Sequence, residues 1–502
     1  MSSSRTFKVA LLSAGRMLTS AVALISAMVL TRVLTVRDYA TYNQTLLAYK
    51  FVSPLLVLGL PSALYFFLPG EKKRARAILI ENLLLLAIMG GIFSVFLLLG
   101  GAHLLAWRFQ NPQLVRTLRI LIPYPLFILP ASGFAACLMA RDRLPSIVTY
   151  NVSSRLVMLA AVVIPCLIWP TPAVALLGTV LGAGIVMFPA LRLMFEACPG
   201  PEWRPTRSGM WQQLRYSVPL GLAMMIDGMM MSLDRFVVAS MCATEAFAVF
   251  SVGATEIPLI SIVTGSLTAV LIPEFSVLFK QERHGDMLVL WQKAMVRSCV
   301  LIFPVMAYLL VMAPEVMRVF FSEKYAASAT VFRVYLLLLP VRITSYGAVY
   351  LATGNTSRLV NRGLGGLVLN AVLSVLLVRW MGYLGAAVGT VLTIYLWTTP
   401  YNLYHVARIL KTSVFKTLAF GPITRVALGV AAACAVFLLP SGLRPKSDLL
   451  DVVLTSALFF PVCGAILQAM GLLKLREIIS DLRRRGARPL PPGAPGGDLP
   501  EE

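Results

Sequence analysis

Residues 77–106 read AILIENLLLLAIMGGIFSVFLLLGGAHLLA, a stretch in which Glu81 is the one side chain charged at neutral pH. The basic segment KKRAR at residues 72–76 precedes it, and Arg108 follows it. A helix needs about 20 apolar residues to cross the hydrocarbon core of a bilayer. The stretch is therefore long and apolar enough for a membrane-spanning helix, and its basic flanks mark the membrane surfaces.

The same pattern recurs along nearly all of the chain. Of its 502 residues, 58% are apolar and 13% are charged, against roughly a quarter charged in an ordinary soluble domain. The mean hydropathy is +0.81. Lipid can cover that much apolar surface, whereas a soluble core of this length cannot. The composition predicts an all-α membrane protein with little soluble structure.

Apolar runs between charged or Pro/Gly-rich breaks predict about fourteen transmembrane helices. Their approximate ranges are 9–34, 40–68, 77–106, 114–140, 146–168, 173–195, 212–241, 247–279, 288–312, 328–353, 359–381, 384–408, 417–439 and 450–473. The ends that would share a side with both termini carry more than twice as many Lys and Arg as the opposite ends. The positive-inside rule then predicts a multi-pass protein of the cell inner (cytoplasmic) membrane with both termini in the cytoplasm.

Several other classes of protein do not fit the sequence. The net charge of +22 reflects the positive-inside rule and an anion inside the bundle better than it reflects nucleic acid. The seven cysteines include no C-x-x-C pair and the three histidines are scattered, so neither a metal site nor a disulfide framework is indicated. We expect no cofactor and no catalytic residues. The apolar stretch at 9–34 is too long for a cleaved signal peptide.

Three short segments recur in the same order in the two halves of the chain. The segment at 39–42 (YATY) resembles 247–250 (FAVF), 138–140 (LMA) resembles 351–353 (LAT), and GTVL occurs at both 178–181 and 389–392. The offsets are 208, 213 and 211 residues. A repeat of this length holds six spans, and because six is even both copies start on the same side of the membrane.

The repeat predicts two parallel six-helix lobes around a central cavity, followed by two additional helices. The predicted boundaries are 1–200 and 201–411 for the lobes, 412–476 for the additional helices, and 477–502 for a basic, then Pro/Gly-rich cytoplasmic tail. This layout suits alternating access, in which two lobes rock about a site near the middle of the membrane. The tail is typical of disorder combined with contact to lipid headgroups.

Four basic residues, Arg16, Lys50, Arg155 and Arg342, fall inside predicted spans. A charge at bilayer depth is costly when it faces lipid, so it should face a cavity or a partner. One interpretation is a cationic lumen that binds an anionic group such as a phosphate, which the planar fork of Arg suits. The alternative is that each charge reaches the interface or forms a local ion pair.

Acidic residues at comparable depth are fewer, with Glu81, Asp227 and Glu256 among them and Asp234 near the end of a span. Asp227 and Asp234 could pair with a cation such as Arg235, or one of them could bind a coupling proton or sodium ion. The methionines at 224–231 are more typical of flexible packing than of a metal site.

Two stretches resemble a known family of membrane proteins. Residues 32–42 (RVLTVRDYATY) resemble the R-x-L-x-x-x-[DE]-[YF]-G-x-[YF] signature that follows the first span of Wzx-type polysaccharide flippases, with Ala40 in place of the usual Gly. Residues 217–220 (SVPL) and 234–236 (DRF) are similar to the entry of that family's second half. These flippases belong to the multidrug/oligosaccharidyl-lipid/polysaccharide superfamily.

The resemblance implies a flippase that moves an undecaprenyl-diphosphate-linked oligosaccharide across the cytoplasmic membrane for cell-surface polysaccharide biosynthesis. It further implies that Arg16, Lys50, Arg155 and Arg342 bind the diphosphate. Besides this lipid-linked substrate, the partners would be membrane lipids and possible glycosyltransferases or a polysaccharide polymerase, with no nucleic acid. Three alternatives are a cation-coupled multidrug exporter of the same superfamily, a membrane polymerase or ligase acting on lipid-linked glycans, and a non-catalytic assembly scaffold.

Overall fold

The computed structural model describes residues 2–355, 357–438, 445 and 447–473. The described residues form helices and connecting turns, without a strand. The prediction of an all-α membrane protein is confirmed. Among the described residues, eight helices are long and apolar enough to span a membrane, and ten segments qualify if each of two bent helix pairs counts as one span.

The first half of the chain folds into α1 to α10. Their bounds are α1 Ser2–Val33, α2 Val36–Val57, α3 Leu60–Phe67, α4 Ala75–Phe96, η1 Leu97–Gly101, α5 Ala102–Arg108, α6 Leu114–Leu121, α7 Tyr124–Ala131, α8 Phe134–Ala140, α9 Leu144–Ile168 and α10 Pro172–Ala197.

The second half continues from α11 to α25. Their bounds are α11 Arg207–Met230, α12 Leu233–Met241, α13 Thr244–Gly253, α14 Pro258–Lys280, α15 His284–Val311, α16 Ala313–Phe321, η2 Glu323–Tyr325, α17 Ser328–Leu336, α18 Leu339–Arg342, α19 Tyr346–Ala352, α20 Ser357–Met381, α21 Tyr383–Thr393, η3 Ile394–Thr398, α22 Thr399–Ile409, α23 Val414–Thr417, α24 Phe420–Ala433, η4 Cys434–Leu438 and α25 Asp448–Ala469.

Each predicted span coincides with one helix or with a chain of short helices. Prolines and glycines explain several of the breaks: α2 ends after Pro54, and Leu58 and Gly59 then adopt positive φ angles before α3 begins. Proline removes a helix hydrogen bond and disturbs the turn before it. The count of fourteen spans stays a prediction, and the order of the helices agrees with it.

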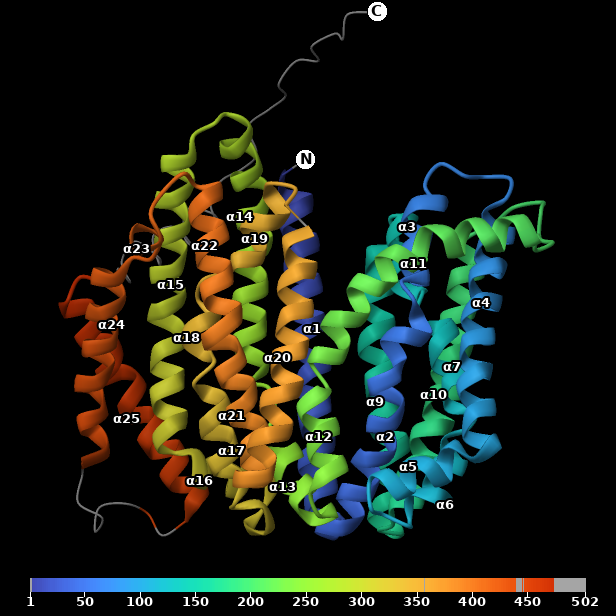
Figure 1. Ribbon diagram of the computed structural model, residues 1–502, viewed down its shortest axis with the longest axis horizontal. Helices are drawn as coiled ribbons and strands as arrows, with labels where there is room; N and C mark the ends of the chain where they lie inside the picture. Colours follow the sequence, from blue (N-terminus) through green and yellow to red (C-terminus); the bar gives the residue numbers. More distant parts are fainter. Residues whose placement is uncertain (1, 356, 439–444, 446, 474–502) are drawn as a thin grey trace, which may run out of the picture.

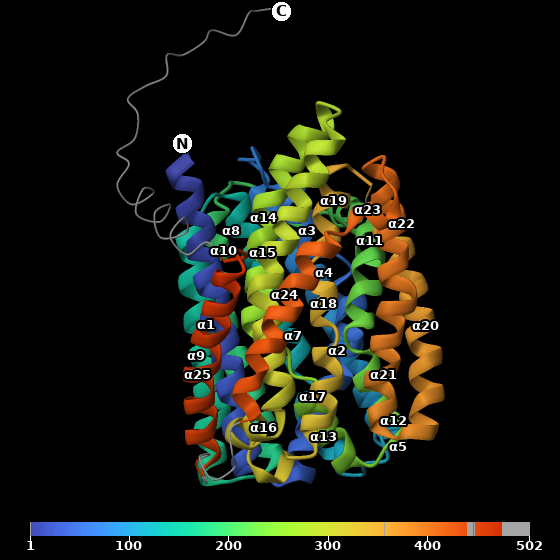
Figure 2. The same cartoon turned by 90° about the vertical axis from the view of Figure 1, so that its left-hand side faces the viewer.

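The helices are arranged in two lobes (Figure 1). We call α1 to α10 the N-lobe and α12 to α22 the C-lobe. Helix α1 packs against α9 and also contacts α14 and α16, and α11 contacts both α2 and α20, so these two helices connect the lobes. Helices α24 and α25 pack against α15 and α16 on the outer side of the C-lobe. Figure 2 shows that α1 begins at the upper end of the bundle, toward which α25 also runs.

The internal repeat corresponds to the same packing arrangement in each lobe. In the N-lobe α10 packs against α9, and in the C-lobe α21 packs against α20. A Cβ added to Gly178 on α10 would lie 2.1 Å from the Ala161 carbonyl oxygen, and one added to Gly385 on α21 would lie 2.2 Å from the Leu377 carbonyl group. Small residues permit this close approach of two helix backbones.

The stretch at residues 32–42 forms the turn between α1 and α2 at the lower end of the bundle. The Asp38 backbone N–H donates to Thr35 Oγ1 over 3.1 Å, which caps the first turn of α2. Arg32 donates to the carbonyl oxygen of Phe320 over 2.9 Å and to that of Val319, both on α16. The stretch therefore fixes a turn of the N-lobe and at the same time ties it to the C-lobe.

Further contacts join the two lobes at this lower end. Arg108 Nη1 donates to the Ser240 carbonyl oxygen over 2.8 Å, and the rings of Tyr39 and Tyr325 meet edge to face with centroids 5.8 Å apart. The ribbons of the lobes converge at the lower end and diverge toward the upper end (Figure 1).

Candidate functional site

The basic residues predicted inside the membrane do not all lie in one site. Lys50 on α2 and Arg155 on α9 are exposed, and Arg342 is the last residue of α18. The side chains of Arg16 and Asp227 lie outside the described part of the chain, so their roles stay predictions.

Lys50 and Arg155 approach a third cation from the other lobe. Lys50 directly follows the buried run 44–49 on α2, and it lies within electrostatic range of both Arg235 on α12 and Arg155. Phe51, which follows Lys50, stacks on Phe236, which follows Arg235, with ring centroids 4.3 Å apart. This contact joins α2 to α12 next to the two basic residues. We call Lys50, Arg155 and Arg235 the cation cluster.

The cation cluster has a clear electrostatic consequence. Like charges in a medium of low dielectric constant repel one another, and a bound anion relieves the repulsion. Because the cluster combines residues of both lobes, an anion bound there would contact both at once.

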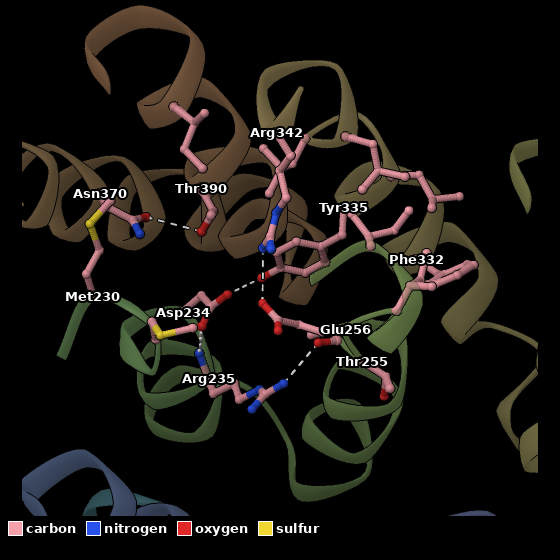
Figure 3. Close-up of a pocket in the computed structure, with 18 of the residues that line it drawn as sticks. Met230, Asp234, Arg235, Thr255, Glu256, Phe332, Tyr335, Arg342, Asn370 and Thr390 are labelled. Atoms are coloured by element: carbon pink, nitrogen blue, oxygen red, sulfur yellow. Dashed lines mark hydrogen bonds and ion pairs between the residues drawn. The ribbon is translucent and has the colours of Figure 1, made fainter. Parts of the chain in front are cut away.

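A cavity of about 750 Å³ opens on the inner side of the C-lobe. Figure 3 shows side chains from α12, α17, α18, α20 and α21 that surround it. The residues with polar side chains that line it are Ser232, Asp234, Arg235, Thr255, Glu256, Tyr335, Arg342, Arg362, Asn370 and Thr390. Arg235 thus belongs both to the wall of this cavity and to the cation cluster.

The carboxyl group of Asp234 and the guanidinium of Arg235 have different side-chain hydrogen-bond partners. The Tyr335 hydroxyl donates to Asp234 Oδ2, and the Arg235 backbone N–H donates to Asp234 Oδ1 over 2.7 Å. The Arg235 guanidinium instead donates to the Ala254 carbonyl oxygen over 2.9 Å. Asp234 is buried, and its side-chain hydrogen-bond partner Tyr335 is a residue that the sequence did not single out.

Arg342 lies on the cavity wall rather than in the cation cluster. Its guanidinium forms an ion pair with Glu256 over 3.1 Å, and both side chains are about half exposed. Figure 3 shows the pair bridging α18 and the segment after α13. The pair offers donors and acceptors side by side at the cavity surface.

Asn370 on α20 contributes a second polar group. Its Oδ1 accepts hydrogen bonds from Ser374 Oγ over 2.8 Å and from Thr390 Oγ1 over 3.4 Å. Its Nδ2 is buried and has no hydrogen-bond partner among the described residues. A buried donor without a partner is costly. The sequence signal for Asn370 is a lone amide in the apolar run LVLNAVLSVLL at 367–377.

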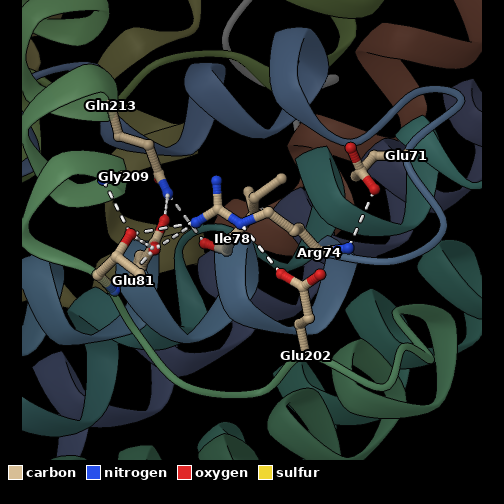
Figure 4. A network of polar contacts seen from close by, with 8 residues as sticks. Glu71, Arg74, Ile78, Glu81, Glu202, Gly209 and Gln213 are labelled. Carbon is tan, nitrogen blue, oxygen red and sulfur yellow. Dashed lines mark hydrogen bonds and ion pairs between the residues drawn. The ribbon is translucent and has the colours of Figure 1, made fainter.

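Glu81, the acidic residue inside the third predicted span, does not line this cavity and belongs to a separate hydrogen-bond network. It is 1% exposed, and it accepts from Arg74 Nη2 over 3.1 Å, from the Thr206 backbone N–H over 2.9 Å and from Gln213 Nε2 over 3.2 Å. Figure 4 shows this network, to which Arg74 adds an ion pair with Glu202. The network attaches the start of α11 to α4, so the first part of α11 packs with the N-lobe.

Within the described ranges, no three His, Cys, Asp or Glu side chains gather in a way that could hold a metal ion. The cavity is lined by ten residues with polar side chains and the cation cluster adds positive charge, a combination that suits an anionic or hydroxyl-rich ligand.

The arrangement of two lobes with an inner cavity has counterparts among known proteins. A family model described as polysaccharide biosynthesis protein matches residues 29–330, which is more than half of the chain. The chain belongs to this polysaccharide biosynthesis protein family. The match includes Lys50, Arg155, Arg235 and Glu256 and confirms the resemblance carried by residues 32–42. No curated protein sequence matches the chain.

Solved structures share the fold at low sequence identity. The lipid II flippase MurJ in an inward closed conformation is 16% identical with a TM-score of 0.68, over 90% of this chain and 99% of that one. A multidrug resistance MATE family transporter in an inward-facing conformation is 14% identical with a TM-score of 0.62, over 79% of this chain and 96% of that one. The fold is that of the multidrug/oligosaccharidyl-lipid/polysaccharide superfamily.

A third similar structure comes from Pyrococcus furiosus. It is a transporter of the same superfamily with a binding pocket of reversed polarity, and it is 14% identical with a TM-score of 0.59 over 81% of this chain and 96% of that one. The present protein is thus a multi-pass membrane protein with a transporter fold, in a family named for polysaccharide biosynthesis.

Proposed function

We propose that the protein is a flippase that moves an undecaprenyl-diphosphate-linked oligosaccharide across the cytoplasmic membrane. The observation that carries this proposal is the cation cluster of Lys50, Arg155 and Arg235, in which the Phe51–Phe236 stack joins α2 of one lobe to α12 of the other. All three residues fall within predicted spans, where a charge facing lipid is costly. A diphosphate would neutralise the cluster. The cationic lining disfavours a cationic drug as the substrate.

The mechanism follows from the position of the cluster. The diphosphate and the sugars cannot cross hydrocarbon unaided, because their polar groups would lose water without replacement. A site shared between two lobes can open first to one leaflet and then to the other. We assign the diphosphate to Lys50, Arg155 and Arg235, with Arg16 as a further predicted contact, and we move Arg342 to the glycan side because of its ion pair with Glu256.

The wider assignments belong to the same proposal. The upper end of the bundle would face the cytoplasm with both termini, and the contacts of Arg32 and Arg108 at the lower end would close the outward side. The predicted lobes at 1–200 and 201–411 would be the moving units. Glycosyltransferases that make the substrate and a polymerase that consumes it would be the functional partners.

The test is transport in proteoliposomes by a Lys50→Gln/Arg155→Gln double variant. The probe is fluorescent undecaprenyl diphosphate N-acetylglucosamine, and chemical quenching of the fluorophore reports the outer leaflet. Hydrogen bonds to charged groups contribute about 1.5–3 kcal/mol each, so we expect transport to fall at least about tenfold.

The matched control is an Arg192→Gln/Arg283→Gln double variant, which also removes two positive charges. Both arginines are exposed and each pairs with a nearby carboxylate of its own helix region. We expect it to transport like the unaltered protein. Undiminished transport in a folded Lys50→Gln/Arg155→Gln variant would contradict the proposal.

A further inference from the structure

We propose that the C-lobe cavity is a glycan subsite, which receives the sugar residues that follow the first one attached to the diphosphate. This inference rests on the proposed flippase function and deepens it. It assigns the two chemical parts of the substrate to different places, the diphosphate to the cation cluster and the sugars to the cavity.

The first step of the argument is the position of Arg235. Phe236, the residue after Arg235, stacks on Phe51, the residue after Lys50, while the Arg235 guanidinium donates to the Ala254 carbonyl oxygen at the cavity wall. A diphosphate bound at the cation cluster would therefore lie at the mouth of the cavity. The first sugar is attached directly to that diphosphate and would lie at the mouth of the cavity, so the sugars that follow it enter the C-lobe.

The second step is the unused hydrogen-bonding capacity of the cavity wall. Asn370 is 1% exposed and lines the cavity, yet its Nδ2 has no partner among the described residues. This enclosed amide becomes available to a sugar hydroxyl or acetamido oxygen when the side chains that cover it move aside. The Arg342–Glu256 ion pair adds donors and acceptors that remain about half exposed, so they can also bond to ligand hydroxyls.

The third step is the shape and mixed polarity of the cavity. Its volume of about 750 Å³ lies within the range of about 300–1,000 Å³ that small-molecule sites occupy. Phe332 and Tyr335 contribute aromatic faces among the polar groups (Figure 3), on which the C–H face of a pyranose can pack. A lipid tail would leave Asp234, Arg235, Glu256 and Arg342 without polar partners from the ligand, so the same lining disfavours it.

The experiment compares two probes in the same proteoliposomes. One is undecaprenyl diphosphate N-acetylglucosamine, with a single sugar, and the other is the lipid-linked oligosaccharide pool extracted from source cells. The variants are Glu256→Gln and Asn370→Leu. Since each removes contacts to sugar hydroxyls, we expect oligosaccharide transport to fall roughly tenfold and single-sugar transport to change by less than about twofold.

The control for Glu256→Gln is Glu315→Gln, because Glu315 also pairs with an arginine, Arg318, but over 3.6 Å and on α16, outside the cavity wall. We expect Glu315→Gln to transport both probes normally. If Asn370→Leu does not fold, Glu256→Gln alone still tests the glycan subsite, because glutamine has the same shape as glutamate.

The outcomes separate the two proposals. If the unaltered protein transports both probes and the cavity variants lower both equally, or lower neither, the glycan subsite is wrong and the flippase function stands. If the unaltered protein transports neither probe, both proposals fall. Selective loss of oligosaccharide transport, together with loss of both probes in Lys50→Gln/Arg155→Gln, supports the subsite.

Discussion

The two lobes contain the same repeated segments, but the side chains of these segments have different surroundings in each lobe. In the N-lobe the Tyr42 hydroxyl and Thr179 Oγ1 lie 3.3 Å apart and are both buried. At the corresponding positions of the C-lobe the chain has Phe250 and Thr390. Phe250 has no hydroxyl group, and Thr390 donates instead to Asn370 at the edge of the cavity.

The polar groups around these positions also differ between the two lobes. Near Tyr42, Asn111 Nδ2 donates to Gln44 Oε1 over 2.8 Å and to Thr41 Oγ1 over 2.9 Å, and Thr45 and Thr117 pair over 2.8 Å. These N-lobe polar groups pair mainly with one another in a packed wall, in which Gln44 Nε2 has no partner among the described residues. In the C-lobe the polar groups line a cavity, and our glycan-subsite proposal rests on this difference between the lobes.

Replacing the two repeat-related threonines with phenylalanine tests this comparison most strongly. Thr179 is 3% exposed in a packed wall, so we expect Thr179→Phe to lower the free energy of unfolding by about 3 kcal/mol, at the upper end of the usual cost of overpacking. Thr390 borders the cavity, so Thr390→Phe should cost less than about 1 kcal/mol. SDS titration in mixed micelles, followed by circular dichroism, measures both.

The two variants should differ in transport as well. Thr390→Phe would fill part of the cavity and lower transport of the oligosaccharide probe while the protein remains folded. Equal destabilisation by the two substitutions would show that the lobes do not differ in packing as described.

A smaller effect concerns the boundary between the lobes. Glu81 holds the start of α11 on the N-lobe through Arg74, Thr206 and Gln213. Glu81→Gln removes the charge and sets an amide donor against the donors around it, which we expect to cost about 2 kcal/mol. Cleavage of the 198–206 connection by added protease should also become faster.

The control is Glu196→Gln, since Glu196 is exposed and pairs with Arg192 within one helix. Exposed pairs of this kind contribute about 0.3–0.5 kcal/mol. Similar stability losses for Glu81→Gln and Glu196→Gln would mean that the network does not anchor α11.

The smallest expected effect compares two tyrosine hydroxyls. Tyr335 donates to the buried carboxylate of Asp234, whereas Tyr42 pairs with the neutral hydroxyl of Thr179. Hydrogen bonds to charged groups are worth about twice as much as neutral ones, so Tyr335→Phe should destabilise by about 1.5 kcal/mol and Tyr42→Phe by about 0.7 kcal/mol. The same SDS titration measures the difference. A larger loss of stability for Tyr42→Phe than for Tyr335→Phe would show that the hydrogen bond to Asp234 is not the stronger of the two.

The sequence by itself determined the helical membrane fold, the order of the helices, the internal repeat and the family. Each follows from local composition, because lipid requires a long apolar run for every span whatever its neighbours are. The sequence also located charges at membrane depth, including Lys50, Arg155 and Glu256. It predicted a common role for Arg16, Lys50, Arg155 and Arg342.

Only the tertiary structure decided which of these charges meet. Arg342 pairs with Glu256, which lies 86 residues away in sequence, and Tyr335 reaches Asp234 across 101 residues. A span that is apolar on all sides carries no periodic signal for the face that turns inward, and contacts between spans depend on helix rotation and close packing. For this reason the cavity, its unpaired Asn370 amide and the difference between the lobes become visible only when the helices are assembled.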